Sequence, residues 1–289
     1  MGATVTTQLF SYASVWIENL HVLPSGNLLL TTIESPDLLY TLNPNVASPT
    51  VTPVTTFPSD ITGVTGIAPL PGNELYAITG GTYTGGAFAN NTMSLFVVSL
   101  ATGNIVNTIP FPGTEMMNGM AAIPSNPYVV LSADSVGGRM LRVDTLTNTV
   151  SVAFTDPSLV PGSSPPPTGV NGLKILGNYL YFTNSDQGTF ARVEIDNDGN
   201  KIGAVEILAA IDGQPDEFAF DGEGNAYIAV HPSSVVKVTP EGVVTTIGNG
   251  TLFQQPTAAA IGLCDDIYVT TGGDYTNTTF AGQLLQVPI

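Results

Sequence analysis

The architecture of this chain follows from the stretch Asn171-Gly-Leu-Lys-Ile-Leu-Gly-Asn-Tyr-Leu-Tyr-Phe182. An Asn-Gly pair opens an apolar run, which turns at Gly-Asn and continues as a second β-rich run. Five further stretches share this plan, and they begin at Glu18, Thr65, Asn118, Asp216 and Thr257. Successive openings lie roughly 40–50 residues apart, a period typical of a β-propeller when each repeat holds several short strands. The sequence therefore predicts an all-β fold with six blades.

The second half of each repeat supplies two more strands. Short β-branched runs such as Ser94-Leu-Phe-Val-Val-Ser and Arg139-Met-Leu-Arg-Val-Asp are followed by turn signals and another strand. No segment keeps a 3.6-residue apolar period, so we expect four-stranded blades and almost no helix. Residues 4–10 and 283–289 also read as strands, and a propeller commonly completes one blade with both termini. We predict one domain over residues 1–289.

The longest stretch rich in turn residues runs from Asp156 to Thr168 and contains Pro-Gly-Ser-Ser-Pro-Pro-Pro. Its position between two repeats predicts a loop between blades rather than a linker between domains. Loops of this length are either surface excursions or lids over a site, and the residues leave both readings open.

Composition narrows the classes of partner. Charged residues make up 10% of the chain, hydrophobic residues 43%, and the formal net charge is −17 with six Lys plus Arg. Such an acidic chain is a poor partner for nucleic acid and for anionic membrane surfaces. No apolar run approaches the length of a transmembrane helix. We expect a small-molecule substrate, and the residues do not predict an oligomeric state.

Three sequons for N-glycosylation indicate a secreted protein or one of the secretory lumen. They are Asn90-Asn-Thr, Asn249-Gly-Thr and Asn277-Thr-Thr, and all fall in predicted loops. In a chain rich in Asn and Thr, one or two would also occur by chance. Cys264 is the single cysteine, and its apolar surroundings in sequence indicate a buried free thiol rather than a nucleophile.

Four of the six repeat openings carry oxygen ligands, and these are Glu18, Asn118, Asn171 and Asp216. Equivalent positions of a radially repeated fold converge on one axis, so two carboxylates and two amide oxygens would meet there. Hard divalent cations prefer such ligands, and the sequence predicts one Ca²⁺ or Mg²⁺ and no organic cofactor. The competing interpretation is that Asn and Asp before Gly form ordinary turns.

Further residues near the repeat openings are candidates for catalysis and for substrate binding. A His or Tyr at the rim of an axial pocket can give or take a proton near neutral pH, and the candidates are His231, His21, Tyr83 and Tyr275. The predicted substrate-binding residues are Trp16, Met116, Met117, Thr65, Thr257 and Asn184. Packing within the blades is the alternative role for each of them.

The repeat openings resemble those of the SMP-30/gluconolactonase/luciferin-regenerating family of six-bladed propellers. The matching stretches are Glu18-Asn-Leu-His-Val, Asn118-Gly-Met, Asn171-Gly-Leu and Pro215-Asp-Glu. The resemblance implies that Glu18, Asn118, Asn171 and Asp216 bind one divalent metal. The sugar lactonases of the family carry an Arg two residues before the first Asn, where this chain has Met116. This departure favours an apolar substrate over a sugar lactone, because Met adapts to irregular apolar shapes.

The stretch from Trp16 to Thr31 is similar to a fungal branch of this family that is encoded with pathways of secondary metabolism. Some members are hetero-Diels–Alderases that join a tropolone quinone methide to a sesquiterpene. The resemblance implies dehydration of a hydroxymethyl tropolone and then a [4+2] cycloaddition, for which orientation and a hydrogen bond to the enone oxygen supply much of the rate. The alternatives are a metal-dependent lactonase and a propeller that only binds a ligand or partner.

Overall fold

The computed structural model describes residues 5–72, 74–263, 266–274 and 280–289. Every regular element in these residues is a β-strand, which confirms the all-β prediction. Nowhere in these ranges does a helix occur with the length and apolarity needed to span a membrane. The chain divides into two compact units. Unit 1 comprises Met1–Val54 and Asp216–Ile289, and unit 2 is Thr55–Pro215.

The described part of unit 1 is built of sets of four antiparallel strands. The first set is β2 (Trp16–Val22), β3 (Leu28–Ile33), β4 (Leu39–Leu42) and β5 (Val51–Pro53). The second set is β20 (Gln214–Phe220), β21 (Ala226–His231), β22 (Ser234–Val238) and β23 (Val244–Asn249). The third set is β24 (Pro256–Ile261), β25 (Asp266–Thr271), β26 (Ala281–Pro288) and β1 (Thr7–Ala13). The first two residues of β20 belong to unit 2.

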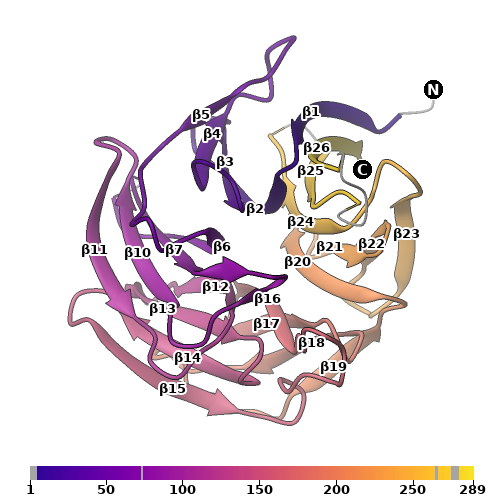
Figure 1. Cartoon of the computed structure of the whole chain (residues 1–289). Coiled ribbons are helices and arrows are strands. Elements are labelled where there is room, and N and C mark those ends of the chain that lie inside the picture. Colours follow the sequence, from indigo (N-terminus) through magenta and orange to yellow (C-terminus); the bar gives the residue numbers. More distant parts are fainter. Residues whose placement is uncertain (1–4, 73, 264–265, 275–279) are drawn as a thin grey trace. The chain divides into compact units, whose positions relative to one another are not determined.

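The N- and C-terminal strands pair in the third set. β1 runs antiparallel to β26, from Thr7 opposite Gln286 to Ala13 opposite Ala281 (Figure 1). The prediction that strands from both ends share one sheet is confirmed, although β1 as described begins at Thr7 rather than at residue 4. The hydroxyls of Tyr12 on β1 and Tyr40 on β4 lie 3.0 Å apart and join this set to the first.

Unit 2 repeats the same plan in its described residues. Its first set is β6 (Gly63–Pro69), β7 (Leu75–Gly81), β10 (Ser94–Ser99) and β11 (Asn104–Pro110), with a short hairpin of β8 (Tyr83–Thr84) and β9 (Ala87–Phe88) between β7 and β10. The second is β12 (Met117–Ile123), β13 (Asn126–Asp134), β14 (Arg139–Asp144) and β15 (Thr149–Thr155). The third is β16 (Val170–Leu176), β17 (Tyr179–Asn184), β18 (Thr189–Glu194) and β19 (Glu206–Ala210).

The core of each unit lies between neighbouring sheets. In unit 1, side chains such as Leu28 and Leu30 from the first set pack against Ala258 and Leu284 from the third. In unit 2, the set of β12–β15 packs in the same way on the set of β16–β19. All six residues of β3 are buried, whereas β11 alternates between exposed and partly buried residues. The inner strands are therefore covered on both faces, and polar residues at their openings are buried with them.

A β-bulge occurs at the opening of five inner strands. The register shifts lie between Ile17 and Asn19, Val64 and Ile67, Met117 and Met120, Val170 and Leu173, and Pro256 and Ala258. These bulges contain Glu18, Thr65, Asn118, Asn171 and Thr257, the openings identified from the repeat. A bulge re-aims the side chain that it carries, so the sequence repeat and the local backbone coincide at the candidate site.

The predicted loop from Asp156 to Thr168 connects β15 and β16 within unit 2, which agrees with a loop between sheets. The carboxylate of Asp186 accepts hydrogen bonds from the backbone N–H groups of Gly162 (2.8 Å) and Thr168 (3.0 Å). Leu159 is fully buried, and Lys201 Nζ lies 2.5 Å from Asp156 Oδ2. These contacts attach the loop to the body of unit 2 along most of its length.

Candidate functional site

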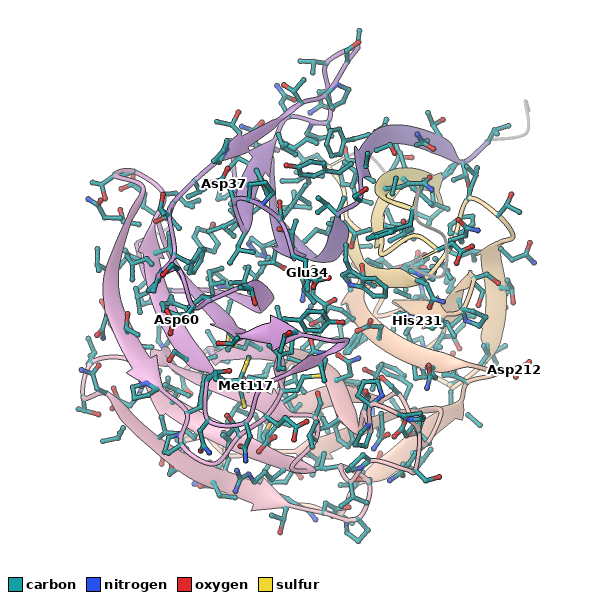
Figure 2. The ribbon with its side chains drawn as sticks, in the orientation of Figure 1. Glu34, Asp37, Asp60, Met117, Asp212 and His231 are labelled. Atoms are coloured by element: carbon teal, nitrogen blue, oxygen red, sulfur yellow. The ribbon has the colours of Figure 1, made fainter. Side chains whose placement is uncertain are left out.

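A buried acidic cluster in unit 1 brings together four of the predicted residues. Glu18 lies in the bulge of β2, Asp216 lies on β20, and His231 is the last residue of β21 (Figure 2). His231 Nε2 is 3.0 Å from Asp216 Oδ2, and the indole N–H of Trp16 donates to Glu18 Oε2 at 2.5 Å. Glu18 and Asp216 are buried, with 6% and 8% of their surface exposed. We call these four residues the acidic cluster.

The imidazole of His231 is held on more than one side. Its Nδ1 lies 2.5 Å from Oε1 of Gln255, and its ring stacks on that of Trp16 with centroids 6.0 Å apart at 23°. Sequence reasoning missed Gln255, although it stands two residues before the opening Thr257, as Trp16 does before Glu18 and Met116 before Asn118. It also passed over Glu217, the buried neighbour of Asp216 on β20. The signals that could have found them are repeat positions: Glu217 follows an opening, and Gln255 precedes one by two residues.

The electrostatics of the acidic cluster favour bound protons. Burial, together with the negative charge of Asp216, raises the pKa of Glu18 to about 8, against the lowering effects of Trp16 and His231. Burial by itself lowers the pKa of His231, but the hydrogen bond and charge of Asp216 outweigh it, with help from Gln255 and Glu18. The pKa of His231 therefore lies above its ordinary value. These shifts favour the carboxylic acid form of Glu18 and the imidazolium form of His231, and either group in that form can donate a proton.

Asn118 and Asn171 lie in unit 2, in the bulges of β12 and β16, and both are buried. The amide of Asn171 donates to Ser185 Oγ at 2.9 Å, and Ser185 Oγ donates in turn to the carbonyl of Pro215 at 2.8 Å. Asn171 Oδ1 is buried and accepts no hydrogen bond from the described residues. Such an orphaned acceptor is costly unless a ligand supplies a donor or a positive charge.

The four predicted metal ligands thus divide into two pairs. Glu18 and Asp216 belong to unit 1, and Asn118 and Asn171 belong to unit 2. The described residues contain no group of three or more His, Cys, Asp or Glu side chains arranged to hold a metal. A cation site in this chain would therefore depend on amide oxygens as well as carboxylates, and the four-residue set stays a prediction.

Several predicted substrate-binding residues have their polar atoms in structural hydrogen bonds. Thr65 Oγ1 donates to the carbonyl of Met117 at 2.7 Å, and Thr257 Oγ1 donates to the carbonyl of Ile17 at 2.7 Å. Each of these hydroxyls ties one opening strand to the next within its unit. Asn184 is fully buried, and its amide donates to the carbonyls of Ser158 and Val160, both at 2.9 Å, which fixes the Asp156–Thr168 loop.

Of the other catalytic and substrate-binding candidates, those that the structure describes are buried or half-buried. Met117 is fully buried at the start of β12 (Figure 2), and Met116 is half-buried beside it. His21 is half-buried on β2 opposite Leu29 of β3. Tyr83 is half-buried in unit 2 and packs edge-on against Phe88. Asn90 and Asn249 are exposed, as glycosylation requires, whereas Tyr275, Asn277 and Cys264 lie outside the described residues.

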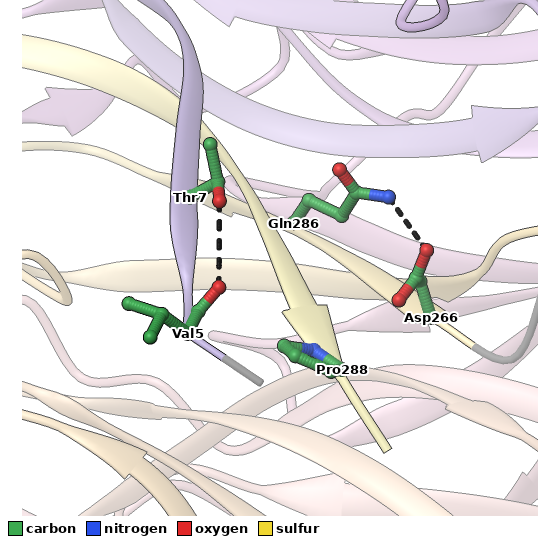
Figure 3. A pocket seen from close by; sticks show the side chains of 5 residues that line it. All are labelled: Val5, Thr7, Asp266, Gln286 and Pro288. Atoms are coloured by element: carbon green, nitrogen blue, oxygen red, sulfur yellow. Dashed lines mark hydrogen bonds between the residues drawn. The ribbon is translucent and has the colours of Figure 1, made fainter. Parts of the chain in front are cut away.

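A shallow hollow of about 230 Å³ lies on the third set of unit 1, lined by Val5, Thr7, Asp266, Gln286 and Pro288 (Figure 3). Gln286 Nε2 donates to Asp266 Oδ2 at 2.5 Å, and Thr7 Oγ1 donates to the carbonyl of Val5 at 3.3 Å. These polar groups satisfy one another, and the hollow shares no residue with the acidic cluster. The chemistry of unit 1 therefore centres on the cluster.

Comparison with known proteins supports the family resemblance. Residues 167–273 match the family described as "SMP-30/Gluconolactonase/LRE-like region". Among curated proteins, "Putative hetero-Diels-Alderase" of Phoma sp is 26% identical, over 94% of this chain and 85% of that protein. "Putative hetero-Diels-Alderase asR5" of Sarocladium schorii is 25% identical, over 88% of this chain and 75% of that protein. The resemblance to this family and to its fungal hetero-Diels–Alderase branch is confirmed.

Solved structures show the same fold. A luciferin-regenerating enzyme superposes with a TM-score of 0.68 at 16% identity, covering 99% of this chain and 95% of that one. A gluconolactonase from Xanthomonas campestris superposes with a TM-score of 0.69 at 12% identity, covering 99% of this chain and 90% of that one. At these identities the likeness shows the fold and says nothing of the activity.

Proposed function

We propose that this protein is a pericyclase of fungal secondary metabolism that catalyses an intermolecular hetero-Diels–Alder cycloaddition. The observation that carries the proposal is the acidic cluster, which gathers two proton donors, the buried Glu18 on β2 and the half-buried His231 on β21, with Asp216 on β20. The names of the two curated relatives support this class of reaction. Met116, which replaces the Arg expected of a sugar lactonase, supports a largely apolar substrate.

The proposed reaction has two stages, and the residues serve the first through proton transfer. A hydroxymethyl tropolone loses water: its carbon–oxygen bond breaks, a proton from Glu18 or His231 joins the leaving hydroxyl, and the ring hydroxyl returns a proton to the cluster. Asp216 stabilises the imidazolium of His231 meanwhile. The resulting quinone methide then adds across a carbon–carbon double bond of a cyclic sesquiterpene, forming one C–C and one C–O bond. A donor aimed at the enone oxygen lowers this second barrier.

We also propose that the sheets of both units form one closed, six-bladed propeller over residues 1–289. Two observations support this arrangement. The superpositions on the luciferin-regenerating enzyme and on the gluconolactonase each cover 99% of this chain, and β1 pairs with β26. Closure would place Asn118 and Asn171 on the same axis as Glu18 and Asp216.

One divalent cation, Ca²⁺ or Mg²⁺, is the cofactor proposed for that axis, held by Glu18, Asn118, Asn171 and Asp216. The orphaned Oδ1 of Asn171 and the raised pKa of Glu18 beside Asp216 fit a positive charge, and the oxygens are hard ligands. Such a cation, when bound, would polarise a carbonyl oxygen and lower the pKa of a bound water. Glu18 would bind it as a carboxylate, so in the cation-bound protein the proton donor would be His231. This set of four oxygen ligands also supports the second candidate function, a metal-dependent lactonase. The family match over residues 167–273 favours that function as well.

We propose that the protein passes through the secretory pathway, because its sequence carries sequons for N-glycosylation. Asn90 lies in an exposed turn and Asn249 is exposed at the end of β23, so both are accessible to glycosylation. Mass spectrometry of protein from a fungal secretion host, before and after treatment with an N-glycanase, tests this. Unmodified Asn90 and Asn249 would contradict it.

One assay separates the two activities. Purified protein is incubated with a hydroxymethyl tropolone and a cyclic sesquiterpene, and separately with gluconolactone-type substrates, each with and without EDTA. Stereoselective adduct that persists in EDTA supports the pericyclase and leaves the cation a structural role. Lactone hydrolysis that EDTA abolishes, without any adduct, overturns the pericyclase and supports the lactonase.

A further inference from the structure

Gln255 holds a backbone conformation that its residue type rarely adopts. Its φ is 53°, in the left-handed region that favours glycine. The surrounding backbone fixes this conformation: the N–H of Gln255 donates to the carbonyl of Pro232 at 2.8 Å, and its carbonyl accepts from the N–H of Gly272 at 2.7 Å. Strained backbone persists where the surroundings determine it, and it gathers at functional sites.

This backbone directs the side chain of Gln255 at the acidic cluster. Oε1 of Gln255 lies 2.5 Å from Nδ1 of His231, and the opposite ring nitrogen, Nε2, lies 3.0 Å from Asp216 Oδ2. An imidazole whose Nδ1–H donates to a fixed oxygen has one ring orientation and presents Nε2 to its other partner. Without such an oxygen, the ring can rotate and exchange its two nitrogens.

Gly272, the backbone partner of Gln255, lies directly against Trp16. A Cβ atom at Gly272 would stand 2.3 Å from Cε3 of the indole, closer than real Cβ atoms approach any atom. The indole is therefore confined between the backbone of Gly272 and the ring of His231, on which it stacks. In this position its N–H reaches Glu18 Oε2.

We propose that Gln255 and Gly272 are positioning residues, which orient His231 toward Asp216 and Trp16 toward Glu18 for proton transfer. The two are linked directly, because the N–H of Gly272 donates to the carbonyl of Gln255. The inference rests on the proposed function, and it adds to that function two residues from outside the repeat openings.

Substitutions separate the side chain of Gln255 from its backbone. Gln255→Gly accepts a positive φ and removes only the side chain, so the fold should persist. Gln255→Asn tolerates the same backbone with a shorter amide and serves as the second truncation. Gln255→Glu keeps an oxygen acceptor at the same reach. Gly272→Ala places a methyl group against Trp16, and Gly222→Ala is its control, because nothing lies within 4 Å of a Cβ at Gly222.

The readouts are specific because the chain has one tryptophan and two histidines. In the wild type we expect two His231 ring N–H protons in slow exchange with water, because Gln255 Oε1 and Asp216 Oδ2 lie within hydrogen-bond reach of Nδ1 and Nε2. Gln255→Gly and Gln255→Asn should lose the Nδ1–H signal and lower kcat for the dehydration about ten- to hundredfold. Gln255→Glu should restore the Nδ1–H signal and most of kcat. Gly272→Ala should shift the emission of Trp16, and Gly222→Ala should not.

A slowly exchanging Nδ1–H signal that persists in folded Gln255→Gly and Gln255→Asn, or unchanged Trp16 emission in Gly272→Ala, would overturn the positioning role. Failure of the proposed function looks different: the spectra change as expected, while wild-type protein forms no cycloadduct. If both truncations unfold, Gln255→Glu decides, and loss of the Nδ1–H signal in that variant overturns the inference.

Discussion

At the scale of single residues, the acidic cluster shows how burial changes the chemistry of ordinary side chains. Glu18 is a carboxylic acid with a pKa of about 8 because it is buried beside Asp216. Sequence reasoning could identify Glu18 and Asp216 because each opens a repeat. It could identify His231 because that residue ends a strand in the repeat that Asp216 opens. It could not assign their protonation, which depends on partners far away in the sequence.

The raised pKa of Glu18 predicts a pH-dependent stability. A group whose pKa is higher in the folded state stabilises that state fully below its unfolded value of 4.5, and this contribution is lost as pH rises toward about 8. Glu18→Gln is neutral at every pH, so in EDTA we expect its Tm to exceed that of the wild type more at pH 8 than at pH 5. Thermal melts at the two pH values measure this, and an equal difference at both would contradict it.

Glu18→Gln should also lose activity while it keeps its fold. The amide cannot protonate a leaving hydroxyl, so we expect kcat for the dehydration to fall by about a hundredfold or more, in the range of general acid catalysis. Steady-state kinetics with the hydroxymethyl tropolone measure this. Asp212→Asn is the control, because Asp212 is exposed in a loop of unit 2 (Figure 2). Full activity of Glu18→Gln would remove Glu18 from the mechanism.

At the scale of elements, the bulges explain why glycine follows several repeat openings. A Cβ at Gly66 would lie 2.1 Å from the carbonyl oxygen of Asn118, and one at Gly119 would lie 2.3 Å from that of Asn171. The backbone of one opening strand thus approaches the next too closely for a side chain. The Asn-Gly pairs that suggested ligands or turns also serve this packing between strands.

Gly119→Ala should therefore destabilise the protein. The added methyl group would meet backbone atoms, which cannot rotate away, and we expect a loss of about 1–3 kcal/mol or more in unfolding free energy. Urea titration followed by far-UV circular dichroism measures the loss, with Gly222→Ala as the matched control. An unfolding free energy within about 0.5 kcal/mol of the wild-type value is typical of a surface substitution. Such a value would show that the two strands can move apart enough to admit the methyl group without loss of stability.

The Asp156–Thr168 loop is a second element whose order depends on one side chain. Asp186 accepts from two backbone N–H groups and from the hydroxyl of Ser164. Asp186→Ala should leave these donors without their acceptor and loosen the loop, so a nonspecific protease should cleave within residues 156–168 several times faster than in the wild type. Asp212→Ala is the control, and equal cleavage of the two variants would show that the loop is held by Leu159 and Lys201 instead.

At the scale of the whole molecule, strands from the two ends of the chain complete one sheet. β1 covers the edge of β26, and Phe10 and Tyr12 pack on the core that the first and third sets share. Deletion of residues 1–13 should expose the edge of β26, lower the Tm by several degrees and promote aggregation. Melting and light scattering measure both effects. Deletion of residues 1–6, which leaves β1 intact, is the control, and an equal Tm for the two deletions would contradict this role for β1.

The sequence by itself determined the strand content, the repeated sets of four strands and the residues that open them. These features depend on apolar periodicity and turn residues, which act over a few positions along the chain. Only the tertiary structure decided what the opening residues do. Thr65 and Thr257 turn to carbonyls of neighbouring strands, while Glu18 and Asp216 meet Trp16 and His231. Gln255 contacts His231 because its backbone, with φ in the left-handed region, directs the side chain toward the imidazole. Contacts of this kind join residues far apart in the sequence, so no local pattern encodes them.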